Sequence, residues 1–344
     1  MFPGAPDRWD IEWVNAERVR SVAAFGLTER QARFLVTVML HSGVFMGRQY
    51  CAFAGITHGQ KVHDFLEKLL ARRYATATAF GPRRRTRLFH VHHKPLYAAI
   101  GEPDNRNRKV VSLGRAIERL MILDGVLADR ALTWLGTERD KRSYFVRRVG
   151  DRVEPHEYPR LVFGKAPNTT IRYFPDKLPI GIEPYGWRHV FLYLATNPMP
   201  MDFRLFLLRH AERLHAVSRW TVRILFPGQL ATVMALFKGA GYEQLASPLH
   251  PAAIEELRWL FRQRRSPSHD HPGLDDERLM TATKAFRAPR FRALYRRWLE
   301  NGDPALWLAQ SPVFRDALER DEAQVECVVL PYAYAHLSSL IATA

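Results

Sequence analysis

Residues 27–93 carry the pattern that most restricts the fold of this 344-residue chain. Three segments with apolar residues at helical spacing are followed by two short segments rich in β-branched and aromatic residues. Thr28 can cap the first helix, Gly43 and Gly55 can end the first two helices, and Gly81-Pro82 predicts a turn between two strands. The expected helices and strands span residues 28–42, 47–54, 59–72, 74–80 and 87–93.

Helix, helix, turn, helix and hairpin is the order of a winged helix-turn-helix, which we expect over residues 27–100. The third helix can enter a DNA major groove, with its N-terminal residues nearest the base edges. The arginine-rich hairpin turn, or wing, can reach flanking phosphates or a narrow minor groove. The DNA-binding residues expected here are Thr57, His58, Gln60, Lys61, His63, Asp64, Lys68, Arg72, Arg73, Arg83, Arg84, Arg85 and Arg87.

The charge distribution points to the same part of the chain. The net charge is +16, and residues 1–150 hold 26 basic and 14 acidic residues against 25 and 21 in residues 151–344. Residues 51–100 alone hold nine basic and two acidic residues. Such a basic segment favours a polyanionic partner, and we expect double-stranded DNA. The alternative is a winged-helix protein-interaction module of a defence or partition complex, with its arginines on a solvated loop.

Two segments flank this expected domain. Residues 1–26 are interpreted as a leader with one amphipathic helix at about 13–25. Residues 101–157 are interpreted as a linker and a connecting helix at about 113–127, which either packs on the winged helix or pairs with a second subunit. Residues 133–142 are expected to be a surface connector, with a ligand-sensing loop as the alternative. Three further phosphate contacts are expected in the linker, at Arg106, Arg108 and Lys109.

The second half of the chain, residues 158–344, alternates apolar strand-like segments with helical ones, which predicts parallel strands in an α/β layer. The whole chain is therefore expected to be α+β, with additional helices at its C-terminal end. The expected strands span residues 160–163, 170–174, 178–182, 189–195, 221–227 and 327–330. The expected helices span residues 202–217, 229–239, 252–265, 274–300 and 304–320.

The segment Leu27-Thr28-Glu29-Arg30-Gln31, the third helix and the arginine-rich wing resemble the replication-relaxation family of plasmid and integrative-element proteins. Members of that family pair a winged helix with a domain similar to PD-(D/E)xK nucleases. Pro175-Asp176 and the strands at 189–195 and 221–226 follow in the matching order, so the resemblance covers about residues 27–240. It implies a transcription regulator or a replication or mobilisation accessory factor of a mobile element.

The nuclease-like half departs from the pattern that catalysis requires. That chemistry needs two carboxylates around a divalent cation and a lysine near the phosphate. Asp176 could supply one carboxylate, but the strand expected to carry the other groups reads Phe191-Leu192-Tyr193-Leu194-Ala195, and Glu183 lies on a different segment. We therefore expect a degenerate nuclease-like domain used for binding or dimerisation, with no catalytic residues. A metal-dependent nuclease is the alternative.

Two groups of histidines and one basic segment could also bind a metal or DNA. His90, His92 and His93, with Cys51, could hold zinc, but no paired-cysteine motif is present, so these histidines are expected to face DNA or solvent. His269 and His271 are expected to belong to a polar loop. The basic segment 284–297, with Arg287, Arg290, Arg292, Arg296 and Arg297, is expected to be a solvated face, with a second DNA contact as the alternative.

The remaining expectations concern partners and location. No apolar run is long enough for a membrane span, no signal-peptide pattern opens the chain, and only two cysteines occur. We therefore expect a cytoplasmic, nucleoid-associated protein with no metal and no cofactor. A homodimer is expected because two-fold DNA sites need a two-fold protein, and protein partners from a mobile element are possible.

Overall fold

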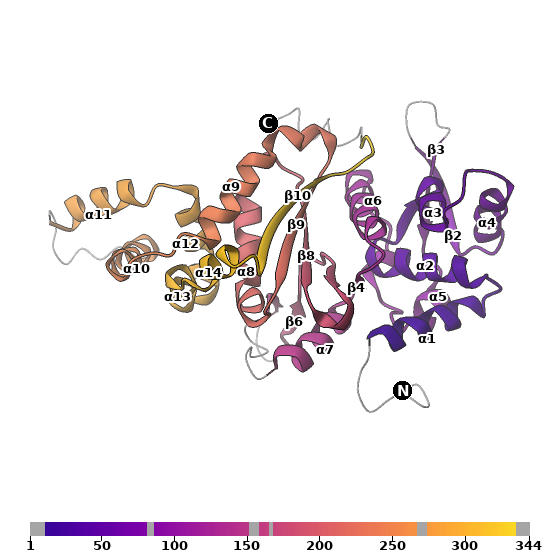
Figure 1. Ribbon diagram of the computed structural model, residues 1–344, viewed down its shortest axis with the longest axis horizontal. Helices are drawn as coiled ribbons and strands as arrows, with labels where there is room; N and C mark the ends of the chain where they lie inside the picture. The colour runs from indigo at the N-terminus through magenta and orange to yellow at the C-terminus, as the bar shows by residue number, and fades with distance from the viewer. Residues whose placement is uncertain (1–10, 81–85, 151–157, 165–167, 267–273, 335–344) are drawn as a thin grey trace.

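The computed structural model describes residues 11–80, 86–150, 158–164, 168–266 and 274–334. The chain is mixed α+β, as predicted. Figure 1 shows an N-terminal unit (residues 11–109) at one end, a sheet unit (residues 133–250 and 312–334) in the middle and a helical extension (residues 251–310) at the other end. Helix α6 (Leu113–Ala128) lies between the first two. No helix among these described residues is long and apolar enough to cross a membrane.

The N-terminal unit contains the predicted helices and hairpin, close to their predicted bounds. Its elements are α1 (Ile11–Ala23), α2 (Glu29–His41), β1 (Val44–Met46), α3 (Gly47–Ala54), α4 (Gln60–Ala71), β2 (Ala75–Phe80), β3 (Thr86–Val91), α5 (Lys94–Ala99) and the 3₁₀ turn η1 (Arg106–Arg108). Thr28 caps α2, since its hydroxyl accepts from the Gln31 N–H at 3.3 Å while the Gln31 side chain accepts from the Thr28 N–H at 3.1 Å.

Strand β1 is an element that the sequence reading missed. It pairs antiparallel with β3 and gives a three-stranded sheet in the order β1-β3-β2. Its middle residue, Phe45, packs its ring on Phe89 of β3 and Phe34 of α2, all of them buried. Three residues are too few to show the alternating pattern of a strand, which explains the omission.

Helix α6 decides between the two alternatives for the connecting helix: it packs within its own chain. Ala116 and Leu120 form a cluster with Val44 of the N-terminal unit, and Leu123 belongs to that unit's core. On its other side, Ile117, Met121 and Val126 cluster with side chains from β8 (His189–Leu194) and β9 (Trp220–Phe226). The homodimer therefore stays a prediction that α6 does not support.

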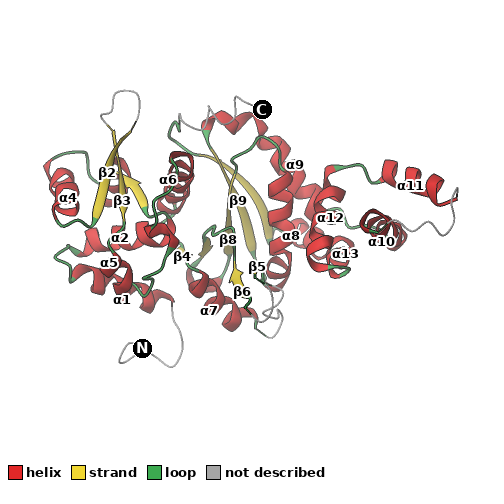
Figure 2. Cartoon of the chain, turned by 180° about the vertical axis from the view of Figure 1, so that it is seen from behind, coloured by secondary structure: helices red, strands yellow, loops and turns green. Residues whose placement is uncertain are grey.

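The sheet unit is built on five strands in the order β10-β9-β8-β7-β4. The predicted parallel pairing is confirmed, because β8, β9 and β10 (Ala323–Val329) run parallel. Strands β7 (Ile180–Ile182) and β4 (Thr133–Leu135) extend the sheet in antiparallel fashion. In Figure 2, α8 (Met201–Ala216) and α9 (Met234–Leu245) lie on the side of the sheet opposite α6. A six-residue 3₁₀ helix, η4 (Gly228–Val233), precedes α9.

The expectation of a surface connector at residues 133–142 was wrong. This segment forms β4 and the start of α7 (Glu138–Val149), and Leu135, Asp140 and Lys141 are buried. Asp140 accepts two hydrogen bonds, at 2.8 and 3.1 Å, from the buried guanidinium of Arg18 in α1. The charge of Asp140 therefore serves a buried ion pair, whose partner Arg18 lies 122 positions away in the sequence.

The predictions of one long helix at 274–300 and another at 304–320 were also wrong. Each is divided by a proline, since the residue before a proline is disfavoured in helical backbone. Ala288 is extended before Pro289, and Ser311 is extended before Pro312. The observed helices are α10 (Pro251–Arg265), α11 (Leu274–Ala285), α12 (Pro289–Asn301), α13 (Pro304–Gln310) and α14 (Val313–Glu319). A separate hairpin comprises β5 (Arg160–Phe163) and β6 (Thr170–Tyr173), and the 3₁₀ turn η3 is Pro184–Gly186.

Candidate nucleic-acid interface

Helix α4 turns one face into the core and the other to solvent. Val62, Phe65 and Leu69 are fully buried. The predicted base-contacting residues of this helix and of the turn before it are exposed: Thr57, His58, Gln60, Lys61, His63 and Asp64. The Gln60 amide donates to the Asp64 carboxylate at 2.6 Å, so these two side chains restrain each other. The exposed face thus offers both hydrogen-bond donors and acceptors.

The C-terminal end of α4 is tied to the turn after α1. The Arg72 guanidinium is exposed, but it donates to the Phe25 carbonyl and lies against Gly26. Arg73 is exposed and takes left-handed backbone with φ of 56°, and Lys68 is half-buried. Of these three predicted DNA contacts, Arg72 already has an intramolecular partner that positions the helix.

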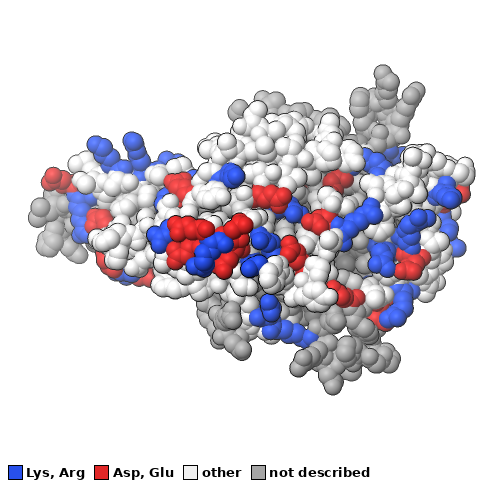
Figure 3. All heavy atoms as spheres, in the orientation of Figure 1, with Lys and Arg blue, Asp and Glu red and all other residues white. Residues whose placement is uncertain are grey.

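The hairpin β2–β3 lies beside α4. Exposed Arg87, at the start of β3, pairs with Glu67 of α4 at 3.1 Å. Arg83, Arg84 and Arg85 lie outside the described residues. In Figure 3, lysine and arginine side chains are spread over the N-terminal unit, at the right of the view, with acidic side chains among them.

The linker residues predicted to contact phosphates sit against the end of α2. The Asn107 amide donates to the carbonyls of Met39 and Leu40 at 3.0 and 3.2 Å, which anchors η1. Lys109 is exposed and Arg108 is half-buried. Arg106 is exposed and lines a cavity between the N-terminal unit and the sheet unit.

The three wing histidines pack within the unit, which corrects the expectation that they face DNA or solvent. His90 is half-buried, and its ring lies 3.1 Å from the Asn107 carbonyl as a hydrogen-bond donor. The His93 ring packs beside Tyr74, with centroids 4.9 Å apart. His92 is half-buried beside His90. Among the described residues no three histidines, cysteines or carboxylates come together as a metal site.

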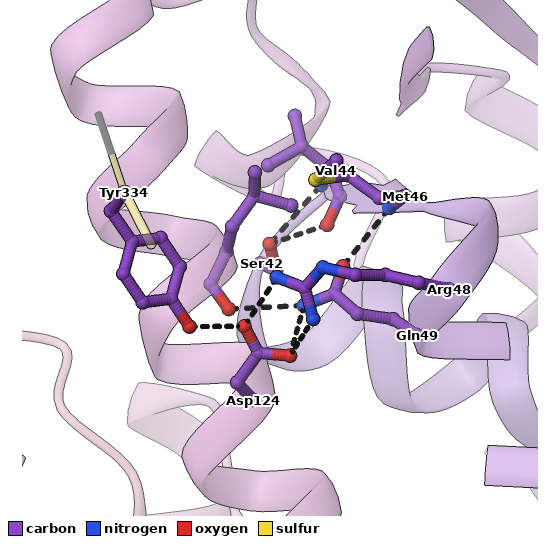
Figure 4. Close-up of polar contacts among 8 residues, drawn as sticks. Ser42, Val44, Met46, Arg48, Gln49, Asp124 and Tyr334 are labelled. Atoms are coloured by element: carbon purple, nitrogen blue, oxygen red, sulfur yellow. Dashed lines mark hydrogen bonds and ion pairs between the residues drawn. The ribbon is translucent and has the colours of Figure 1, made fainter. Parts of the chain in front are cut away.

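A polar network that the sequence reading missed fixes α3, the helix before α4 (Figure 4). Both terminal nitrogens of Arg48 donate to the Asp124 carboxylate of α6 at 2.8 Å. The Gln49 amide donates to the same carboxylate at 2.9 Å and to the Leu120 carbonyl at 3.0 Å. The Tyr334 hydroxyl also donates to Asp124. Burial and the neighbouring Asp124 raise the pKa of Tyr334, so this hydroxyl keeps its proton.

Asp176, the residue considered for a nuclease site, is held by donors from its own chain. Its carboxylate accepts from His210 at 2.8 Å and from the Leu178 N–H at 3.1 Å. Burial opposes its ionisation, but His210 and Lys141 outweigh this and lower the pKa of Asp176 to about 2. Burial lowers the pKa of His210, so a neutral imidazole donates to an ionised carboxylate. These contacts connect the loop before β7 to α8.

The basic segment 284–297 is only partly a solvated face, which corrects that expectation. Arg290 is buried and donates to the Ser247 carbonyl at 2.7 Å, and buried Arg297 pairs with Glu300 at 3.1 Å. The exposed cations of this segment are Lys284, Arg287, Arg292 and Arg296. His269 and His271 lie outside the described residues.

No protein-family model, curated protein or solved structure matches this chain. The resemblance to the replication-relaxation family therefore stays a prediction from the sequence motifs. The exposed face of α4, its anchored neighbour α3 and the adjacent hairpin are the features from which a function can be argued.

Proposed function

We propose that this protein binds double-stranded DNA through its N-terminal unit, acting as a winged helix-turn-helix. In this proposal α4 enters the major groove, and the hairpin β2–β3 lies along the flanking backbone. The observation that carries the proposal is the exposed polar face of α4, with Gln60, Lys61, His63 and Asp64 on the helix that follows the turn. Base readout requires such a mixture of donors and acceptors.

The charge of this unit supports a phosphate-rich partner. Residues 51–100 hold nine basic and two acidic residues, and Arg87 is exposed beside α4. Lys61 forms no ion pair with any residue that the structure describes, so its charge is available to a ligand. Each phosphate that such a side chain neutralises releases counterions and strengthens binding at low salt.

The anchoring of α3 supports a preorganised interface. In a helix-turn-helix the first helix braces the second, so its attachment determines how the second helix is presented. Arg48 and Gln49 fasten α3 to Asp124, and the core of the unit holds α4 behind α3 through Tyr50 and Phe65, whose rings are 4.3 Å apart. A fixed helix loses little conformational entropy when it binds.

The biological role that follows is occupancy of a DNA site, in which no bond is made or broken. We propose a transcription regulator or a replication or mobilisation accessory factor of a mobile element. The sheet unit, as a degenerate nuclease-like fold, would supply docking or dimerisation. Selection of bound duplexes from a random library distinguishes these roles, because a palindrome beside a promoter indicates a regulator and a site at an element's origin indicates mobilisation.

Electrophoretic mobility shifts over a salt series test the DNA-binding proposal. The double variant Gln60→Ala/Lys61→Ala should change the preference among duplexes by about 1–3 kcal/mol per contacted base pair. Replacing Arg83, Arg84 and Arg85 by alanine should weaken binding to all duplexes and reduce the salt dependence by about three phosphate contacts.

The matched control is Lys284→Ala/Arg296→Ala, which removes two exposed cations from the helical extension. It should leave affinity and preference unchanged. The proposal fails if the control weakens binding as much as the wing variant does. If the intact protein retains no duplex even at low salt, the N-terminal unit is instead a protein-docking module.

A further inference from the structure

A cavity of about 210 Å³ lies where the N-terminal unit, α6 and the sheet unit meet. One wall comes from η1 and α6, and the opposite wall comes from the hairpin β5–β6 and residues 174–177. Six cationic side chains from these separate parts of the chain line it: Arg106, Arg115, Arg119, Lys141, Arg172 and Lys177. The packing of α6 against the sheet brings them together.

Most of this positive charge has no counter-charge. Arg119 is only 8% exposed; its Nη2 donates to the Arg106 carbonyl at 3.4 Å, while its Nη1 is buried with no hydrogen-bond partner among the described residues. Arg106, Arg172 and Lys177 form no ion pair with any residue in the described ranges. Arg115 is the exception, since it pairs with Glu118. A buried, unpaired guanidinium nitrogen is costly unless an acceptor reaches it.

The acidic residues of the cavity do not cancel this charge. Asp176 is held by His210 and Leu178. Glu102, Asp104 and Glu138 also line a neighbouring cavity, which Arg106, Arg115, Arg119 and Lys177 do not line. These three acids are therefore shared with an adjoining space.

The electrostatics at Lys177 agree with this layout. Partial burial, followed by the charges of the four arginines, lowers the pKa of Lys177 to about 8. Lys177 also takes left-handed backbone, with φ of 57°, and Phe174 does so with φ of 47°. Such backbone costs about 1–3 kcal/mol at a residue other than glycine and is concentrated at binding sites.

The wall opposite α6 also carries exposed apolar side chains. Leu161 and Phe163 of β5 are 45% and 50% exposed and line the cavity together with Tyr173. We propose that this cavity binds a small phosphorylated molecule, with its phosphate held by Arg119, Lys177 and Arg172 and its less polar part against Leu161 and Phe163. Arginine is suited to this role because its planar donors match phosphate oxygens.

Because the site lies on α6, its ligand can also affect DNA binding, and this part of the inference rests on the proposed function. Arg119 and Asp124 lie on the same helix, and Asp124 anchors α3. A ligand that binds Arg119 can therefore change the orientation of α3 and α4. Such coupling requires a difference in ligand affinity between the DNA-bound and free protein, which makes it measurable.

Calorimetric titration of the full chain with inorganic pyrophosphate and with adenosine monophosphate tests the site without DNA. Both probes should bind saturably, and the nucleotide should gain from the apolar wall. Lys177→Asn/Arg172→Gln should weaken pyrophosphate binding about tenfold or more, the effect expected from losing charge-assisted hydrogen bonds. Asparagine at 177 tolerates the left-handed backbone, which keeps the wall intact.

The control is Lys284→Asn/Arg296→Gln, which removes the same charge from the helical extension and should leave the affinity for pyrophosphate within about twofold. Equal loss in both double variants, or no saturable binding by the wild type, would falsify the site. A duplex that displaces pyrophosphate from the wild type in direct competition would also overturn it, because the cations would then belong to the DNA surface. Ligand binding with no DNA binding would instead leave this site standing and remove the proposed function.

Discussion

Three buried histidines, His41, His189 and His210, show how single residues tie this protein's stability to pH. Burial lowers the pKa of His41 to about 3 and that of His189 to about 4, and it lowers the pKa of His210 as well. The His189 ring makes two polar contacts, from Nε2 to the Tyr144 hydroxyl at 2.7 Å and from Nδ1 to the Arg219 carbonyl at 3.4 Å. These imidazoles are therefore neutral in the folded protein at neutral pH.

The free energy of unfolding should fall as the pH falls below about 6.5. Below that value the unfolded chain binds protons that the folded protein does not, and the loss continues until the folded pKa values are reached. Between pH 6.5 and pH 5, each of His41 and His189 should cost about 2 kcal/mol. Urea unfolding at several pH values measures this dependence.

The variant His189→Asn should flatten the pH dependence over this interval, because its side chain does not titrate. His215→Asn is the comparison, since His215 lies on the exposed side of α8, beside Trp307. An unchanged slope in His189→Asn would show that His189 is protonated while folded.

At the scale of elements, α6 packs closely against the sheet. A Cβ atom added at Gly125 would lie 2.4 Å from Cδ1 of Leu225, which is itself buried in β9. Gly239 in α9 is the useful contrast, because nothing lies within 4 Å of a Cβ added there. Two glycines within helices thus differ in what surrounds them.

Gly125→Ala should destabilise the protein relative to Gly239→Ala by about 1–3 kcal/mol, which is the cost of overpacking a filled core. Both variants gain the same intrinsic helix propensity, about 0.5–1 kcal/mol, so their difference isolates the steric term. Chemical denaturation measures both. Equal stabilisation by the two substitutions would mean that Leu225 moves aside freely and that α6 is loosely docked.

At the scale of the whole molecule, Asp124 connects three parts of the chain. It joins α3 through Arg48, the body of α6, and the segment after β10 through Tyr334. The Tyr332 ring lies 3.6 Å from the Arg48 guanidinium and covers the pair. The N-terminal and sheet units are thereby held by both packing and charge, so we expect them to unfold in one cooperative transition.

Asp124→Ala should reduce stability by about 3 kcal/mol, because it leaves a partly buried guanidinium without its counter-charge. Differential scanning calorimetry should then show the N-terminal unit melting ahead of the sheet unit. Asp129→Ala is the matched control: the Asp129 carboxylate is more exposed than that of Asp124, and its partner Arg223 keeps Glu326, so its loss should cost about 0–1 kcal/mol. Similar losses in both variants would refute a coupling role for Asp124.

Local patterns in the sequence account for most of the helices and for the parallel strands. The Thr28 cap, the glycine ends of α2 and α3 and the apolar face of α4 depend on residues a few positions apart, so their patterns predicted these helices closely. The apolar strands at β8 and β9 likewise predicted parallel pairing. The exposure of the polar face of α4 follows from the same helical period.

Features that depend on contacts between distant residues became visible only in the folded protein. The three-residue strand β1 exists because β3 pairs with it, and α6 is buried on two sides because two units meet there. The same packing joins Arg48 to Asp124 and gathers Arg106, Arg119 and Lys177 around one cavity. These contacts depend on strand order and helix docking and join residues tens of positions apart. No local periodicity in the sequence predicts them.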